Sequence, residues 1–241
     1  MKLTSIISAI FVTLLFNQMP YSQQNGNSDS FTREELTNDM FNLIVSKGLN
    51  SNGNGHIYHF EKYGSLASDL AAEMLDFVEV EREKLPLLRL LKYNRSAASQ
   101  HAPKVIEIFN EKIGKDLTEV ELTLMLRCMK TICFIDPNSI ETFTFLTKAM
   151  SEEYWNEERL PHVTFYDERD IGLVKERLRK VACDSLGYIG GEKALKAIES
   201  EISLEKERIA RGNGRTNLLY VMEWTANYIR DYDTLHNPAR N

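Results

Sequence analysis

The sequence predicts an all-α protein built from stacked antiparallel helix pairs. Apolar residues recur every three to four positions in most segments after residue 30, and two capping boxes with nearby Gly and Pro residues mark helix ends. No stretch alternates between apolar and polar residues over more than four positions, as a β-strand would. We therefore expect helices joined by turns and loops.

The composition is that of one globular domain. Of the 241 residues, 43% are hydrophobic and 27% are charged, which excludes a disordered, collagen-like or multi-span membrane chain. We expect a single helical domain over 31–235 and a polar tail over 236–241. The formal net charge of -6 argues against binding to nucleic acid or to an anionic membrane.

Residues 1–22 have the pattern of a secretory signal peptide. Lys2 precedes an apolar stretch over 3–16, and the chain then turns polar up to the expected cleavage after Ser22. A permanent membrane anchor is the weaker interpretation, because the apolar stretch is shorter than the ~20 residues that cross a bilayer. The polar residues 23–30 are expected to form a flexible leader. The sequence thus predicts a protein exported to the periplasm or the medium.

The first helix is expected over 32–47. Thr32 and Glu35 form its capping box, and Gly48 suits the left-handed residue that follows a helix. The next segment, 49–64, is rich in Asn and Gly and predicts a long loop.

Two abutting helices follow the loop. Helical spacing begins at Ser65 and continues to Pro86, where proline should break or restart the helix, and the apolar segment then runs to Tyr93. Pro103 suits the first turn of another helix, which Gly114 should end.

The best-defined helix begins at Thr118. Thr118 and Glu121 form the second capping box, and an apolar face continues to Cys133. Asp136 and Pro137 are expected to cap and start an antiparallel partner helix.

The segment 156–169 loses the helical period and predicts a second long loop. Helical spacing returns at Ile171 and forms a hairpin around Gly190 and Gly191. A last helix is expected over about 216–232.

The hairpin resembles a HEAT-type repeat of the short bacterial form, most clearly over 171–210. In such a repeat the first helix ends in Leu-Gly-x-Ile/Leu-Gly and the second begins with Ala-Leu, and here the matching residues are Leu186, Gly187, Ile189, Gly190, Ala194 and Leu195. A shift of 54 positions places the hairpin around Asp136 on the same template with a poorer match. The resemblance implies a right-handed stack of helix pairs, a scaffold commonly used to bind protein surfaces, and it implies no catalytic residue.

Two loop clusters combine imidazole and carboxylate groups, which suit zinc. Neither has the fixed helical spacing or the further ligands that a metal site needs, so we expect surface residues and predict no metal and no other cofactor. The residues are His56, His59 and Glu61 in the first loop, and His162, Asp167 and Asp170 in the second.

Three cysteines, Cys128, Cys133 and Cys183, are an odd number for an exported chain. Cys128 and Cys133 point about 140° apart on one helix and cannot bridge each other. We expect all three to be buried and reduced, while a bridge from Cys183 to either of the others, or a nucleophilic Cys–His pair, stays a minor alternative.

Tyr220, Trp224 and Tyr228 form an aromatic stripe at four-residue spacing on the last helix. The stripe would either cap the stack against the preceding helix pair or contact a partner protein, with Arg211 and Arg215 at its rim. We expect capping, so that Trp224→Ala would lower stability and the partner surface would lie elsewhere, on the concave face of the stack; partner contact through Tyr220, Trp224 and Tyr228 is the alternative.

The sequence favours an exported, non-catalytic helical-repeat protein that acts as a protein-binding scaffold or adaptor. Motifs for a nucleophilic serine, a phosphate loop or paired Cys-x-x-Cys are missing from the sequence, and adjacent acids such as Glu152 and Glu153 are expected to be solvated charge. The alternatives are an exported helical enzyme, such as a hydrolase, with its site in loops 49–64 and 156–169, and a protective protein that neutralises a secreted toxin. The oligomeric state stays open.

Overall fold

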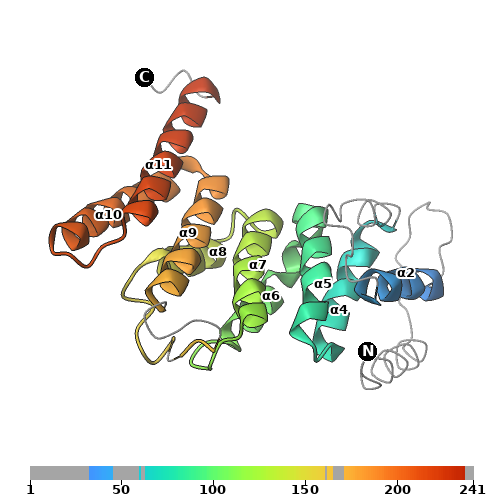
Figure 1. Ribbon diagram of the computed structural model, residues 1–241. Coiled ribbons are helices and arrows are strands. Elements are labelled where there is room, and N and C mark those ends of the chain that lie inside the picture. The colour runs from blue at the N-terminus through green and yellow to red at the C-terminus, as the bar shows by residue number, and fades with distance from the viewer. Residues whose placement is uncertain (1–32, 46–59, 61–62, 161, 165–170, 237–241) are drawn as a thin grey trace. The chain divides into compact units, whose positions relative to one another are not determined.

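The computed structural model describes residues 33–45, 60, 63–160, 162–164 and 171–236. These residues form helices and turns, and their only β-structure is an isolated bridge between Leu117 and Val163, so the predicted all-α class is confirmed. The helices (Figure 1) are α2 (Arg33–Val45), α4 (Ser65–Phe77), α5 (Glu81–Asn94), the 3₁₀ helix η2 (Arg95–His101), α6 (Ala102–Asn110), α7 (Glu119–Ile135), α8 (Ile140–Met150), α9 (Ile171–Ile189), α10 (Gly191–Ala210) and α11 (Thr216–His236).

Contacts between the helices divide the chain into two compact units, Met1–His101 and Ala102–Asn241. The single domain expected over 31–235 stays a prediction. No helix within the described ranges is long and apolar enough to cross a membrane. The expected signal peptide, the leader and the capping box at Thr32 lie outside the described residues.

In the first unit, α2 packs against α4 and α5, and η2 packs against both α4 and α5. The expected break at Pro86 is wrong. The chain leaves the helical conformation at Val78 and Val80, both extended, and Pro86 lies inside α5.

Burial explains why α5 tolerates this proline. A proline inside a helix costs about 3 kcal/mol, because it removes one backbone hydrogen bond and crowds the preceding turn. The four leucines that follow it are fully buried, and each stabilises the fold by about 1.5–3 kcal/mol. Together they outweigh the cost; they are Leu87, Leu88, Leu90 and Leu91.

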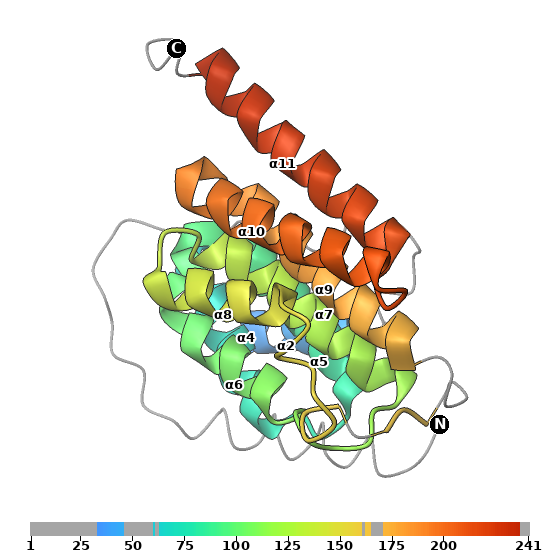
Figure 2. The same ribbon diagram turned by 90° about the vertical axis from the view of Figure 1, so that its left-hand side faces the viewer.

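In the second unit the helices pack in sequence order in two layers. Helices α7, α9 and α11 contact one another in turn, while α6 packs on α7, α8 packs on α9 and α10 packs on α11 (Figure 2). At the ends of α7 and α9, Phe134 stacks on Tyr188 with ring centroids 3.8 Å apart. This arrangement leaves α11 at the edge of the unit, with α9 and α10 as its neighbours.

The capping box that starts α7 is confirmed. The Glu121 backbone N–H donates to the Thr118 hydroxyl at 3.3 Å, and the Glu121 carboxylate accepts from the Thr118 backbone N–H at 2.9 Å. The expected cap of the next helix is wrong. Ser139, whose hydroxyl accepts from the Glu141 N–H at 3.1 Å, caps α8, while Asp136 ends α7.

The hairpin between α9 and α10 lies where the sequence predicts it. Gly190 and Gly191 both have positive φ, 68° and 76°, a conformation that side chains disfavour. A Cβ on Gly187 would lie 2.4 Å from the Thr225 side chain, so only glycine allows α9 and α11 to approach this closely. The expected core residue Leu186 is fully buried.

The described part of the segment 156–169 packs against other residues of the second unit. Trp155 precedes it, is fully buried and donates its indole N–H to the Ala149 carbonyl at 2.8 Å. Val163 pairs with Leu117 in the isolated bridge. These contacts hold Trp155 against α6 and α8, and Val163 against the residue that precedes the cap of α7.

Candidate functional site

Helix α11 carries a stripe of exposed aromatic side chains that is separate from its buried face. Leu218, Met222, Ala226 and Ile229 are buried. The aromatic ladder, as we name the exposed set, consists of Tyr220 (70% exposed), Trp224 (58%), Tyr228 (49%) and Tyr232 (50%). Its four-residue spacing keeps the side chains on adjacent turns of one face.

The expectation that the aromatic stripe caps the stack is wrong. The smaller apolar residues of α11 already cover α9 and α10, and the aromatic ladder points away from them. The three predicted residues Tyr220, Trp224 and Tyr228 are therefore brought together on one exposed surface, and the sequence reasoning missed the fourth, Tyr232. The same four-residue spacing would have identified it.

Three rings of the aromatic ladder, those of Trp224, Tyr228 and Tyr232, lie next to one another along α11. Trp224 and Tyr228 are stacked, with centroids 5.8 Å apart and 15° between the planes, and Tyr228 and Tyr232 are 6.3 Å apart. A flat group inserted between two rings needs two contacts of about 3.5 Å each, or about 7 Å in all. A partner therefore cannot insert a flat group between Trp224 and Tyr228 or between Tyr228 and Tyr232, and it meets the edges and hydroxyl groups of these rings instead.

Charged residues between α10 and the aromatic ladder are paired. Lys206 lies 2.8 Å from Glu223, and Arg230 lies 2.6 Å from Glu199. Each pair joins α10 to α11 and cancels its own charge. This border of the aromatic ladder is therefore close to neutral although the chain as a whole is acidic.

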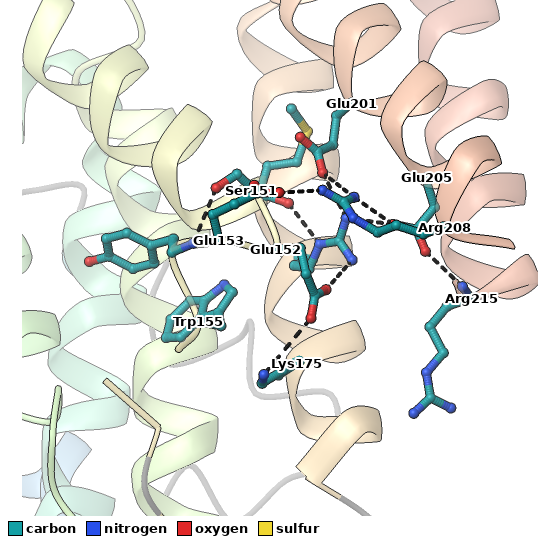
Figure 3. A network of polar contacts seen from close by, with 12 residues as sticks. Ser151, Glu152, Glu153, Trp155, Lys175, Glu201, Glu205, Arg208 and Arg215 are labelled. Atoms are coloured by element: carbon teal, nitrogen blue, oxygen red, sulfur yellow. Dashed lines mark hydrogen bonds and ion pairs between the residues drawn. The ribbon is translucent and has the colours of Figure 1, made fainter. Parts of the chain in front are cut away.

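A buried ion network fixes α11 to the rest of the unit (Figure 3). At its centre is Arg179 of α9, 1% exposed, whose Nε donates to the Met150 carbonyl at 2.9 Å. Its Nη1 donates to Glu152 at 2.6 Å, and its Nη2 donates to Glu201 at 2.9 Å and to Glu205 at 2.7 Å. One guanidinium thus joins the end of α8, α9 and α10.

Glu205 extends this network to the start of α11. Its second oxygen accepts the Arg215 backbone N–H at 2.7 Å, one residue before the helix begins (Figure 3). Burial alone would raise the pKa of Glu205, but this hydrogen bond and those from Arg179 and Arg208 hold it below the usual value. The carboxylate is therefore charged at neutral pH and fixes the position from which α11 starts.

Arg208 closes the network from the side of α10. It donates to Glu201 at 2.8 Å, to Glu205 at 3.0 Å and to Glu153 at 2.7 Å. Burial opposes its charge, yet these carboxylates raise the pKa of Arg208 above its already high value. The expectation that Glu152 and Glu153 are merely solvated is wrong, because each binds an arginine of this network.

The sequence reasoning missed Arg179 as the centre of this network. The i,i+4 acids Glu201 and Glu205, followed by Arg208, were the one local signal available. Arg179 itself looks like any other surface arginine in the sequence, since its partners lie 22 to 29 residues away.

The residues weighed as metal ligands are not gathered into a site in the part of the chain that the structure describes. His162 is exposed, and its backbone carbonyl accepts from Leu117 at 3.1 Å. The other five, His56, His59, Glu61, Asp167 and Asp170, lie outside the described residues. Among described residues, no three His, Cys, Asp or Glu side chains lie close enough to hold a metal ion.

The three cysteines are buried and free of disulfides, as predicted. Burial raises the pKa of the Cys183 thiol to about 12. Such a thiol carries almost no thiolate at neutral pH and is a poor nucleophile.

The first unit contains one further polar cluster. The His101 Nε2 lies 2.9 Å from Asp69, Gln100 donates to the same carboxylate at 2.7 Å, and Asn94 donates to the Ser68 hydroxyl at 2.6 Å. These bonds join the end of α5 and η2 to α4. Their observed role is to connect helices.

No protein-family model matches the chain, and no curated protein or solved structure is significantly similar to it.

Proposed function

We propose that this protein is an exported, non-catalytic scaffold that binds a partner protein through the aromatic ladder of α11. The observation that carries the proposal is the exposure of four aromatic side chains on one helix face.

The chemistry of the aromatic ladder suits a protein partner. Tyr and Trp are enriched at protein interfaces and among the residues that dominate binding energy. Each combines a large apolar area with a polar atom, so the aromatic ladder can stay solvated when free and release water when bound. The acidic net charge of the chain disfavours nucleic acid as the partner.

The scaffold and the export are also part of the proposal. The two-layer packing of α7 to α11 and the glycine turn at Gly190 support a HEAT-like stack. The basic start and apolar stretch of residues 1–22 support export. Mass spectrometry of the native protein should find a new N-terminus between about residues 20 and 25; an intact Met1 would contradict export.

Binding is tested by affinity capture with the chain from residue 23 onward. A captured protein is identified by mass spectrometry, purified and titrated against the wild type and against Trp224→Ala. We expect the substitution to weaken binding by about 2 kcal/mol, which is about 30-fold.

Ile140→Ala is the matched control, since Ile140 is a large apolar residue that is 73% exposed on α8. It should leave binding unchanged. Equal affinities for the wild type and Trp224→Ala, or equal losses in both variants, would contradict the proposed surface.

A further inference from the structure

We propose that the protein bound by the aromatic ladder is a second copy of this chain, with the two α11 helices antiparallel and Trp224 on the two-fold axis. This inference rests on the proposed function and names its partner. The area, the spacing and the charges of the surface carry it.

The exposed area is of the size that a weak dimer needs. A Tyr or Trp buries about 150–250 Å², so four side chains that are about half exposed offer roughly 450 Å² on each copy. Two copies bury roughly 900 Å², and the polar residues beside the rings bring the total near the ~1,000 Å² of a weak biological interface. We therefore expect a dimer that forms at micromolar concentration.

The four-residue spacing makes the surface self-complementary. In an antiparallel pair centred on Trp224, Tyr220 of each copy faces Tyr228 of the other, because both are four residues from the axis. A two-fold interface uses the same residues on both sides. The stacked rings admit no group between them, so edges and hydroxyl groups meet across the axis.

Charge favours the antiparallel arrangement over the parallel one. The exposed Asn217 lies near the start of α11, and the exposed Asp231 lies near its other end. Antiparallel pairing centred on Trp224 places Asp231 of one copy opposite Asn217 of the other, near the N-terminal end of the partner helix, whose dipole favours a carboxylate, whereas parallel pairing places Asp231 opposite the same residue of the other copy. The ion pairs of Lys206 with Glu223 and of Arg230 with Glu199 reduce repulsion between the two acidic chains.

The first test is the oligomeric state of the chain from residue 23 onward, by sedimentation velocity between about 1 and 100 µM. We expect a concentration-dependent dimer, a dissociation constant raised at least 30-fold by Trp224→Ala, and no change with Ile140→Ala. A wild type that stays monomeric to 100 µM, or a dimer that is unaffected by Trp224→Ala, would overturn the inference.

Cysteine cross-linking tests the orientation. Asn217 and Asp231 lie seven residues before and after Trp224, both are exposed, and both are within about 20° of it around the helix. All three native cysteines are buried, so a new thiol at either position is selectively oxidised. An equimolar mixture of Asn217→Cys and Asp231→Cys should give the mixed disulfide dimer in excess.

Parallel pairing would instead give disulfides between two copies of the same variant, and that outcome would overturn the antiparallel arrangement.

The proposed function and the proposed dimer are contradicted by different results. A monomeric chain that still binds a captured protein through Trp224 overturns only the second copy as partner, whereas a chain that neither dimerises nor binds through Trp224 overturns the proposed function.

Discussion

Arg179 of α9 joins the end of α8 and α10 through one buried guanidinium. A buried charge costs several kcal/mol unless its hydrogen bonds are satisfied, and here Nε, Nη1 and Nη2 all have acceptors. Removal of the guanidinium would leave Glu201 and Glu205 charged and buried, with Arg208 as the remaining cation that both of them contact.

We predict that Arg179→Met lowers the free energy of unfolding by about 3–5 kcal/mol, because it breaks a buried ion network from one side. Urea denaturation followed by circular dichroism measures the change. Arg211→Ala is the control: Arg211 forms only an exposed pair with Glu207, and its loss should cost less than about 1 kcal/mol. Similar losses for the two variants would contradict a central role for Arg179.

The cysteines give a second prediction for single residues. Because all three are buried and the pKa of Cys183 is raised to about 12, the folded protein should react with a thiol reagent only on the time scale of unfolding. Thiol titration at pH 8 should count three reactive groups in urea and essentially none without it. A fast-reacting thiol in the folded protein would show that one cysteine is accessible.

Among the helices, α5 has an unfavourable C-terminal end. The residue that caps this end is Arg95, whose φ of 50° and ψ of -131° suit glycine and strain a side chain. The side chain is exposed.

We predict that Arg95→Gly raises the free energy of unfolding by about 1 kcal/mol, because the strain outweighs the greater freedom of glycine in the unfolded chain. The control is Arg89→Gly within the same helix. This substitution should lower the free energy of unfolding by about 1 kcal/mol. Thermal denaturation compares the stability of both variants with that of the wild type. Destabilisation by Arg95→Gly would contradict backbone strain at Arg95.

Local signals predicted the helices where the stabilising group is close in sequence. The capping box of Thr118 and the glycines at 190 and 191 act within a few residues, and each lies where expected. Pro86 misled because the leucines that follow it in α5 are buried, and α5 packs against α4 and α2, which are distant in sequence; this burial outweighs the local cost of the proline. The direction of the aromatic ladder depends on which face of α11 meets α9 and α10, and periodicity alone does not determine that.

For the whole molecule, the lowered carboxyl pKa values predict sensitivity to acid. The pKa values of Glu121, Glu153 and Glu205 are all held below the usual value: burial opposes this in each, and hydrogen bonds and neighbouring cations outweigh it. A carboxylate with a lowered pKa in the folded state contributes its stability above about pH 4.5 and loses it as the pH falls through the folded value.

We therefore expect the melting temperature to hold steady between pH 7 and 5 and to fall from about pH 4.5 downward. Glu205→Gln should melt at a lower temperature at pH 7 and show a shallower fall below pH 4.5, since it lacks one of the titrating groups. Calorimetry across this range measures both curves. A melting temperature that rises below pH 4.5 would contradict the stabilising role of these charged carboxylates.

The contrast between the two tryptophans gives the protein a built-in pair of optical probes. Trp155 is fully buried, and its indole N–H is bonded to a carbonyl, whereas Trp224 is exposed on α11. The fluorescence emission of Trp155 should therefore be blue-shifted and insensitive to iodide, while the emission of Trp224 should be red-shifted and readily quenched by iodide. Without any attached dye, the blue component reports the folding of the second unit, and the quenchable component reports whatever covers α11.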